Sequence, residues 1–191
     1  VFDGSALEDT LLVAFETLYT EEKEVGIHAE IEDDAQTVYL PKIRTNAKDG
    51  ITDIDHTEAL EKATIIDTVS YSSLLPGKEY TVSGTLMNKA TGEAVLIDGK
   101  PITASTTFTA EKAEGSVDIV FEFDASAIAG TTVVAFESME YKGIEVAVHA
   151  DITDEDQTVY IPKVRTTAIR FFTGLQLFSN LIASNFLMYL R

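Results

Sequence analysis

Cysteine is absent from this chain of 191 residues. Its absence excludes a disulfide framework, zinc sites built from thiolates, and a cysteine nucleophile. Positive charge is scarce, since 14 Lys and Arg residues face 32 Asp and Glu residues and leave a formal net charge of -18. Such a surface repels a phosphate backbone, so nucleic acid is excluded as a partner. A secreted protein without disulfides must be stabilised by another device.

The apolar content and the length are those of a globular protein. Apolar residues make up 45% of the chain, and its length has room for one ordinary domain and part of another. The chain begins with Val1 and carries no recognisable signal peptide. We therefore expect an internal or processed fragment, whose location no targeting segment reveals.

The sequence repeats itself at an offset of 121 residues. The segment FDGSALEDTLLVAFE (Phe2–Glu16) aligns without a gap with FDASAIAGTTVVAFE (Phe123–Glu137). The same offset carries the motif PKIRT at residues 41–45 onto PKVRT at residues 162–166. A gap-free internal repeat of this length indicates two copies of one domain.

The domain boundaries follow from the repeat. We expect residues 1–46 to be the C-terminal part of one domain and residues 47–167 to be a complete second copy. A short polar linker at residues 45–50 would join consecutive domains as a string. Residues 168–191 form a separate apolar tail.

The complete copy alternates apolar and polar residues and has no long helical period. Tyr80, Val82 and Leu86 alternate with hydroxyl side chains, and turn signals such as Leu75-Pro76-Gly77-Lys78 separate the runs. About seven or eight short strands with hairpin-length connections predict an all-β, immunoglobulin-like antiparallel β-sandwich. A β-barrel is the alternative.

Three polar features interrupt the apolar pattern of the complete copy. They are Asp67-Thr68-Val69-Ser70-Tyr71, the Glu137 that ends VVAFE, and an acidic segment from His149 to Gln157. Gln157 shares its parity with the apolar residues of the last strand, so its side chain is expected to face the core. A buried amide is costly unless it is hydrogen-bonded or chemically consumed.

With these motifs the sequence resembles the VaFE-repeat domains of Gram-positive surface proteins, also called Thr–Gln ester-bond domains. The resemblance covers the complete copy from about Thr64 to Thr167 and part of the copy before it. Several motifs in the right order carry it, namely LVAFE, VVAFE, DTVSY, LPGKEY, LIDGK, FDAS and H-x-D-x-x-D-x-x-Q-T-V.

The resemblance implies an intramolecular ester between a threonine of the first strand and a glutamine of the last, here Thr68 and Gln157. A threonine hydroxyl needs a positioned base, and His149 could accept its proton and pass it to the departing ammonia. A buried, neutral carboxylic acid could stabilise the developing oxyanion. Glu137 is the first candidate for this acid and Asp98 the second.

Each candidate also has a simpler interpretation. Thr68 could be a strand former, His149 a solvated loop residue, Glu137 an outward-facing side chain, and Asp98 a turn residue. The acidic run at residues 151–156 lacks the calcium-loop pattern, so a solvated turn is favoured and a weak calcium site stays the alternative. We expect no cofactor and no dedicated metal site.

The partial copy and the tail carry their own predictions. Gln36, His28 and Glu16 repeat the site, but no partner threonine precedes them in this chain. We expect Gln36 to stay an ordinary amide and the partial copy to fold poorly alone. The uncharged segment 171–190 is long enough to span a bilayer, and a membrane anchor, an interfacial helix and an artefactual ending all stay open.

Three functions are compatible with these features. The first is a structural spacer in a cell-wall-anchored adhesin or pilus-like stalk on the bacterial surface, with neighbouring repeats as its partners. The second is an adhesive module whose loops bind a host ligand. The third is an enzyme, but the electrophile lies in the same chain, so we expect a single turnover and no catalysis on an outside substrate.

Overall fold

The computed structural model describes residues 4–167. This part of the chain consists of β-strands and three short 3-10 turns, so the predicted all-β class is confirmed. None of its helical segments is long and apolar enough to cross a membrane. The predicted tail at residues 168–191 lies outside the described residues. The 3-10 turns are η1 (Ser5–Leu7), η2 (Asp34–Gln36) and η3 (Ala125–Ile128).

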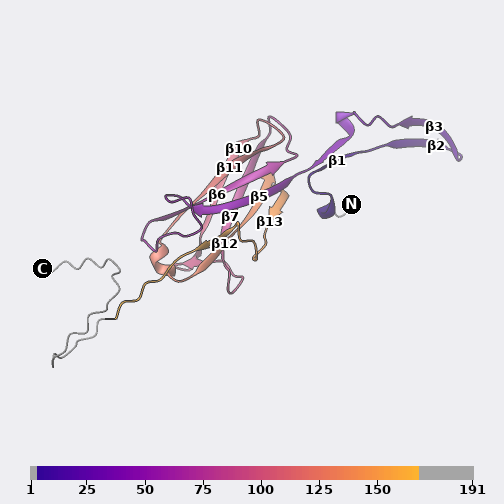
Figure 1. Ribbon diagram of the computed structural model, residues 1–191. Helices are drawn as coiled ribbons and strands as arrows, with labels where there is room; N and C mark the ends of the chain where they lie inside the picture. Colours follow the sequence, from indigo (N-terminus) through magenta and orange to yellow (C-terminus); the bar gives the residue numbers. More distant parts are fainter. Residues whose placement is uncertain (1–3, 168–191) are drawn as a thin grey trace, which may run out of the picture.

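The complete copy is a sandwich of two antiparallel sheets (Figure 1). One has the strand order β11-β6-β5, and the other β10-β7-β12-β13 with β14 beside β12. This order matches strands E-B-A and C-F-G of an immunoglobulin domain, and the separate sheets exclude the barrel. The strands are β5 (Lys42–Asp49), β6 (Ala63–Ser72), β7 (Glu79–Asn88), β10 (Thr103–Thr109), β11 (Gly115–Phe123), β12 (Thr132–Tyr141), β13 (Ile144–His149) and β14 (Thr158–Tyr160), with a small hairpin of β8 (Leu96–Ile97) and β9 (Lys100–Pro101).

Alternation along the strands builds the core between the sheets. Every second residue of β6 from Ala63 to Tyr71 is buried, as the period of two requires when one face is covered. The sheets come close together where the Phe121 ring lies over Gly84. A Cβ atom at Gly84 would lie 2.6 Å from Phe121 Cζ, so this position has room only for glycine.

Two separate strands, β13 and β14, pair with the same edge of β12. β13 pairs with the second half of β12 and β14 with its first half, and residues 150–157 loop out between them. The loop is held at its end, because the Ala135 N–H donates to the Gln157 carbonyl at 3.1 Å and the Ala47 N–H donates to the Asp156 carbonyl at 2.9 Å. The loop therefore joins β12 of one sheet to β5 of the other.

The predicted domain boundary at residues 46/47 cuts a strand. β5 pairs with β6 along its whole length, from Lys42 opposite Ser72 to Asp49 opposite Ile65. The expected polar linker at residues 45–50 is therefore mostly sheet, and Pro41 alone separates β4 from β5. A strand that supplies one edge of a sandwich belongs to that sandwich.

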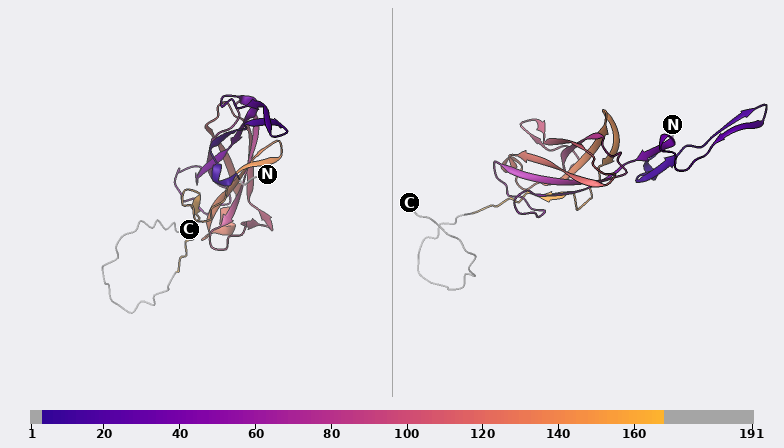
Figure 2. Two further views of the ribbon diagram at one scale, coloured as in Figure 1. Left: turned by 90° about the vertical axis from the view of Figure 1, so that its right-hand side faces the viewer. Right: turned by 90° about the horizontal axis from the view of Figure 1, so that it is seen from above.

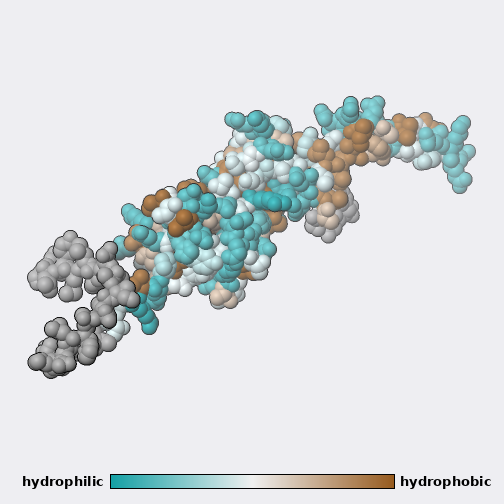
Figure 3. All heavy atoms as spheres, viewed as in Figure 1, coloured by the Kyte–Doolittle hydropathy of each residue, from teal (hydrophilic) through white to brown (hydrophobic). Residues whose placement is uncertain are grey.

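The partial copy repeats only the β12–β13–β14 region of the complete copy. It extends from one end of the sandwich as a narrow ribbon (Figures 1 and 2), and its apolar side chains are visible on its surface (Figure 3). Its strands are β1 (Thr10–Val13), β2 (Glu16–Thr20), β3 (Lys23–His28) and β4 (Thr37–Leu40), and they pair as β1–β4 and β2–β3. Its exposed apolar residues include Leu11, Phe15, Leu18, Tyr19, Val25, Ile27, Ile31 and Val38.

Candidate functional site

A threonine, a glutamine and a glutamate meet between the two sheets. The Thr45 hydroxyl donates to Glu137 Oε2 at 3.0 Å. The Gln157 side-chain amide contacts both the Thr45 hydroxyl and the Glu137 carboxyl. The exposed fractions of Thr45, Glu137 and Gln157 are 6%, 2% and 0%. A hydroxyl and a carboxamide are therefore in direct contact in a site from which water is excluded.

Strand alternation aims each of these side chains inward. Thr45 lies between the buried Ile43 and Ala47 on β5, and Glu137 lies between the buried Ala135 and Met139 on β12. Gln157 precedes β14 and faces the core, as its parity predicted. The three residues come from β5, from β12 and from the segment before β14, so only the complete fold brings them together.

A second acid, Asp67 of β6, completes the buried cluster. Asp67 is fully buried, and both of its carboxyl oxygens lack a partner among the described residues. Burial raises the pKa of Asp67. Burial also raises the pKa of Glu137, and the neighbouring Asp67 raises it further because two buried like charges repel. The pair therefore holds at least one proton at neutral pH.

His149 stands beside the cluster at the end of β13, directly opposite Glu137 in the sheet. Its Nε2 atom lies 3.1 Å from Asp154 Oδ2, while its Nδ1 atom is buried without a partner among the described residues. A carboxylate on one ring nitrogen orients an imidazole and leaves the other nitrogen free to exchange a proton. Asp154 thus holds the ring in place.

The structure does not bring Thr68 to Gln157. Thr68 is paired with Asn46 on the outer face of its sheet, and its hydroxyl donates to Asp118 Oδ1 at 2.8 Å. Its neighbour Asp67 is the residue of β6 that points into the core. The predicted contact between Thr68 and Gln157 is therefore corrected: Thr45 makes this contact, and Thr68 faces outward, since successive side chains of a strand face opposite ways.

Asp98 is also remote from this chemistry. It lies exposed at the tip of the β8–β9 hairpin with a φ of 51°, followed by Gly99. No hydrogen bond found within residues 4–167 joins it to the buried cluster. Its role is that of a turn residue, because aspartate tolerates this left-handed conformation.

Sequence reasoning missed Thr45, Asp67 and Asp154. A signal for Thr45 was present, because the motif P-K-x-R-T recurs and its threonine shares parity with Ile43 and Ala47. The polar neighbours of this threonine instead suggested a linker. Asp67 directly precedes Thr68 on β6, and its side chain faces the core while that of Thr68 faces outward.

The arrangement is suited to acyl transfer within the chain. A hydroxyl in contact with an amide, an oriented imidazole and a protonated carboxyl are the groups that such a reaction uses. Holding the reactants in contact can contribute about 7–11 kcal/mol through proximity and orientation. Residues that could hold a metal ion occur elsewhere in the described chain, at His28, Glu30 and Asp33.

Comparison with known protein families identifies the family of this chain. The family model of the T-Q ester bond containing domain matches residues 1–40 and residues 41–161. The two matches cover most of the chain, which belongs to this family. The match confirms the resemblance seen in the sequence, with a partial copy followed by a complete one. Its division at residues 40/41 agrees with the start of β5 after Pro41.

Solved structures include a similar fold. A bacterial adhesin from Mobiluncus mulieris, containing intramolecular disulfide, isopeptide and ester bond cross-links, is similar in two crystal forms. The form in space group P21 gives a TM-score of 0.50 at 18% identity over 63% of this chain and 56% of that chain. The form in P1 gives 0.52 at 17% identity, over 65% and 58%. The present chain thus spans little more than half of the adhesin chain, and at this identity the likeness shows the fold alone. Comparison with curated proteins gives no match.

Proposed function

We propose that this chain is a structural module of a bacterial surface stalk, in which an ester between Thr45 and Gln157 carries tensile load. The observation that supports it is the buried contact between the Thr45 hydroxyl and the Gln157 amide. Family membership and the adhesin-like fold agree with a location on the cell surface.

The ester forms by an exchange of one bond for another. Thr45 Oγ1 attacks Gln157 Cδ, a C–O bond forms, the C–N bond breaks, and the nitrogen leaves as ammonia with the hydroxyl proton. His149 carries this proton from the hydroxyl to the leaving nitrogen, held in position by Asp154. No other reactant is consumed.

The carboxyl pair stabilises the transition state. Glu137 Oε2 accepts the Thr45 hydroxyl and so fixes its direction. The oxygens Gln157 Oε1 and Glu137 Oε1 are both buried without a partner among the described residues. A proton on Glu137, retained because the carboxyl is buried and Asp67 lies beside it, is available to the oxygen on which negative charge develops.

The position of the ester explains its mechanical use. Thr45 lies on the first strand of the sandwich and Gln157 directly before the last, and their side chains are in contact. The segments that precede and follow the sandwich leave it at opposite ends (Figures 1 and 2). Tension entering through Pro41 crosses the ester to the last strand and bypasses the residues between. Since the electrophile is consumed, the module turns over once and is not an enzyme toward outside substrates.

Mass spectrometry of the intact chain tests the proposal. We expect the loss of one ammonia, about 17 Da, because one hydroxyl–amide pair reacts and, among residues 4–167, no threonine hydroxyl is hydrogen-bonded to the Gln36 side chain. Thr45→Val should abolish the loss, whereas the matched Thr68→Val on the outer face should keep it. Tandem spectra should show peptides with residues 45 and 157 joined. A wild-type mass equal to that of the sequence would reject the ester.

Two shortened chains test which strand the module needs. A chain that starts at residue 41 retains Thr45 and should lose ammonia, whereas one that starts at residue 47 lacks both Thr45 and most of β5 and should not. Ester formation in the shorter chain would show that another hydroxyl reacts with Gln157.

Force spectroscopy tests the mechanical role. Thr45 and Gln157 are 112 positions apart, so the chain between them would add about 39 nm on full extension, at about 3.5 Å per residue. We expect this extension to be absent in the wild type and present in Thr45→Val. An adhesive module that bears no load would instead need a bound ligand, and specific retention on a glycan or matrix-protein array would favour that alternative.

A further inference from the structure

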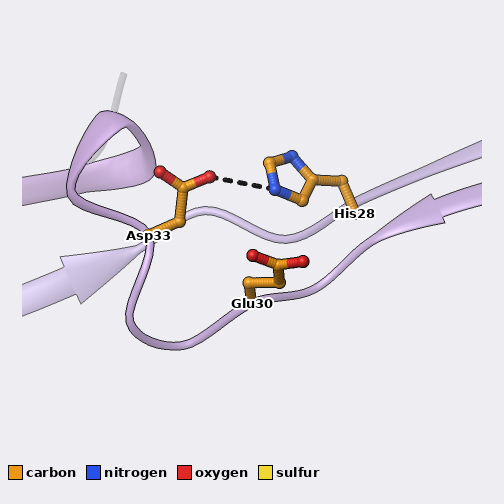
Figure 4. Close-up of side chains that lie close together, drawn as sticks. All are labelled: His28, Glu30 and Asp33. Carbon is orange, nitrogen blue, oxygen red and sulfur yellow. Dashed lines mark ion pairs between the residues drawn. The ribbon is translucent and has the colours of Figure 1, made fainter.

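The partial copy contains a cluster of three side chains that lies outside the Thr45–Gln157 site. His28 ends β3, Asp33 caps η2, and Glu30 lies between them; Figure 4 shows all three side chains close together. His28 Nε2 lies 2.9 Å from Asp33 Oδ2, as His149 lies from Asp154 in the complete copy at 3.1 Å. One ligand atom from each of the three residues lies within 4.8 Å of the others.

The third ligand distinguishes the two copies. At the repeat position of Glu30 the complete copy has Asp151, whose carboxylate is bound by the Thr153 N–H at 2.8 Å and the Thr153 hydroxyl at 2.7 Å. The partial copy has Glu32 in place of Thr153, so that hydroxyl is missing. Glu30 is also one methylene longer than Asp151. Its carboxylate lies within 4.8 Å of a ring nitrogen of His28.

We propose that His28, Glu30 and Asp33 bind a divalent transition metal ion of the zinc type. An imidazole nitrogen with two carboxylate oxygens is a donor set that zinc accepts, whereas calcium and magnesium prefer oxygen alone. The two carboxylates neutralise the charge of the ion, and a fourth position is left for water. Among residues 4–167, this is the one group of three such residues whose ligand atoms lie within 4.8 Å of one another.

The ion would give the partial copy an internal clamp. It would join the end of β3 to the turn that leads into β4. Binding energy at such a site adds to folding energy when the unfolded chain lacks the site. The imidazole lone pair that binds the ion is then unavailable for proton transfer, so the two copies use the same histidine differently.

Isothermal titration of the full, chelator-treated chain with zinc chloride tests the proposal. We expect about one equivalent to bind, with affinity reduced roughly ten- to hundredfold by His28→Ala. The double exchange Glu30→Asp with Glu32→Thr, which installs the residues of the complete copy, should cause a similar loss. His56→Ala is the matched control, because His56 Nδ1 lies 2.8 Å from Asp55 and belongs to no three-ligand cluster. Its binding curve should equal that of the wild type.

The melting transition and the ammonia loss of each variant show that the complete copy is intact, because the cluster lies outside it. Absence of saturable zinc binding by the wild type would overturn the proposal. Binding that His28→Ala or the double exchange leaves unchanged, or that His56→Ala weakens equally, would overturn it as well.

Discussion

Removing the Thr45 hydroxyl should lower the Tm of the module strongly, because the ester can no longer form. Thr45→Val keeps nearly the same side-chain volume at a site that is 6% exposed, so it leaves no large cavity. It deletes the nucleophile and the hydrogen bond to Glu137. The matched exchange Thr68→Val removes only a partly exposed hydrogen bond to Asp118.

The magnitude follows from the loop that the ester closes. The cross-link spans 112 residues, and chain entropy for a loop of this size gives about 5 kcal/mol of stabilisation. The unfolding entropy of a module of this length is about 0.25 kcal/mol/K, so this loss corresponds to about 20 °C in Tm. Thr68→Val should change the free energy of unfolding by less than about 1 kcal/mol.

Differential scanning calorimetry of the two variants and the wild type, with each mass measured first, checks this reasoning. A Thr45→Val module that lacks the ester but melts within a few degrees of a cross-linked wild type would refute the entropy argument. An equal loss of Tm in Thr68→Val, which keeps the ester, would show that the lost stability does not come from the cross-link.

Three further predictions concern the buried acid, the core and the proton carrier. Because burial raises the pKa of Glu137 above its ordinary 4.5, the folded chain holds a proton that the unfolded chain releases, and stability falls as pH rises above that value. In a Thr45→Val background, urea titrations between about pH 5 and pH 8 should show a fall in stability to which Glu137 contributes up to about 1.4 kcal/mol per pH unit. Glu137→Gln should make this slope smaller, whereas Glu140→Gln, at an exposed position of the same strand, should not. Gly84→Ala should cost about 1–3 kcal/mol in the same assay, because the new methyl group meets an aromatic ring of the facing sheet; a neutral result would contradict the close packing. His149→Ala should slow ammonia loss about 10²–10⁴-fold in a mass time course after refolding, and an unchanged rate would remove its role as proton carrier.

The sequence by itself determined the architecture and three of the site residues, namely Gln157, Glu137 and His149. Alternation of apolar and polar residues is a local property, so it identified the strands and the inward direction of Gln157. The internal repeat set apart a partial and a complete copy, and the ordered motifs pointed to the ester-bond family. Glu137 and His149 could be proposed from the same motifs, and the structure places them at one end of the β12–β13 pair.

Only the tertiary structure decided which hydroxyl meets the amide. Thr45 and Thr68 lie on neighbouring strands with opposite orientation, and each is a plausible strand residue in its local sequence. Periodicity states that alternate residues share a face, but the pairing of β5 with β6 and the packing of the two sheets determine which face becomes the interior. A contact across 112 residues depends on that packing, and no local pattern contains it.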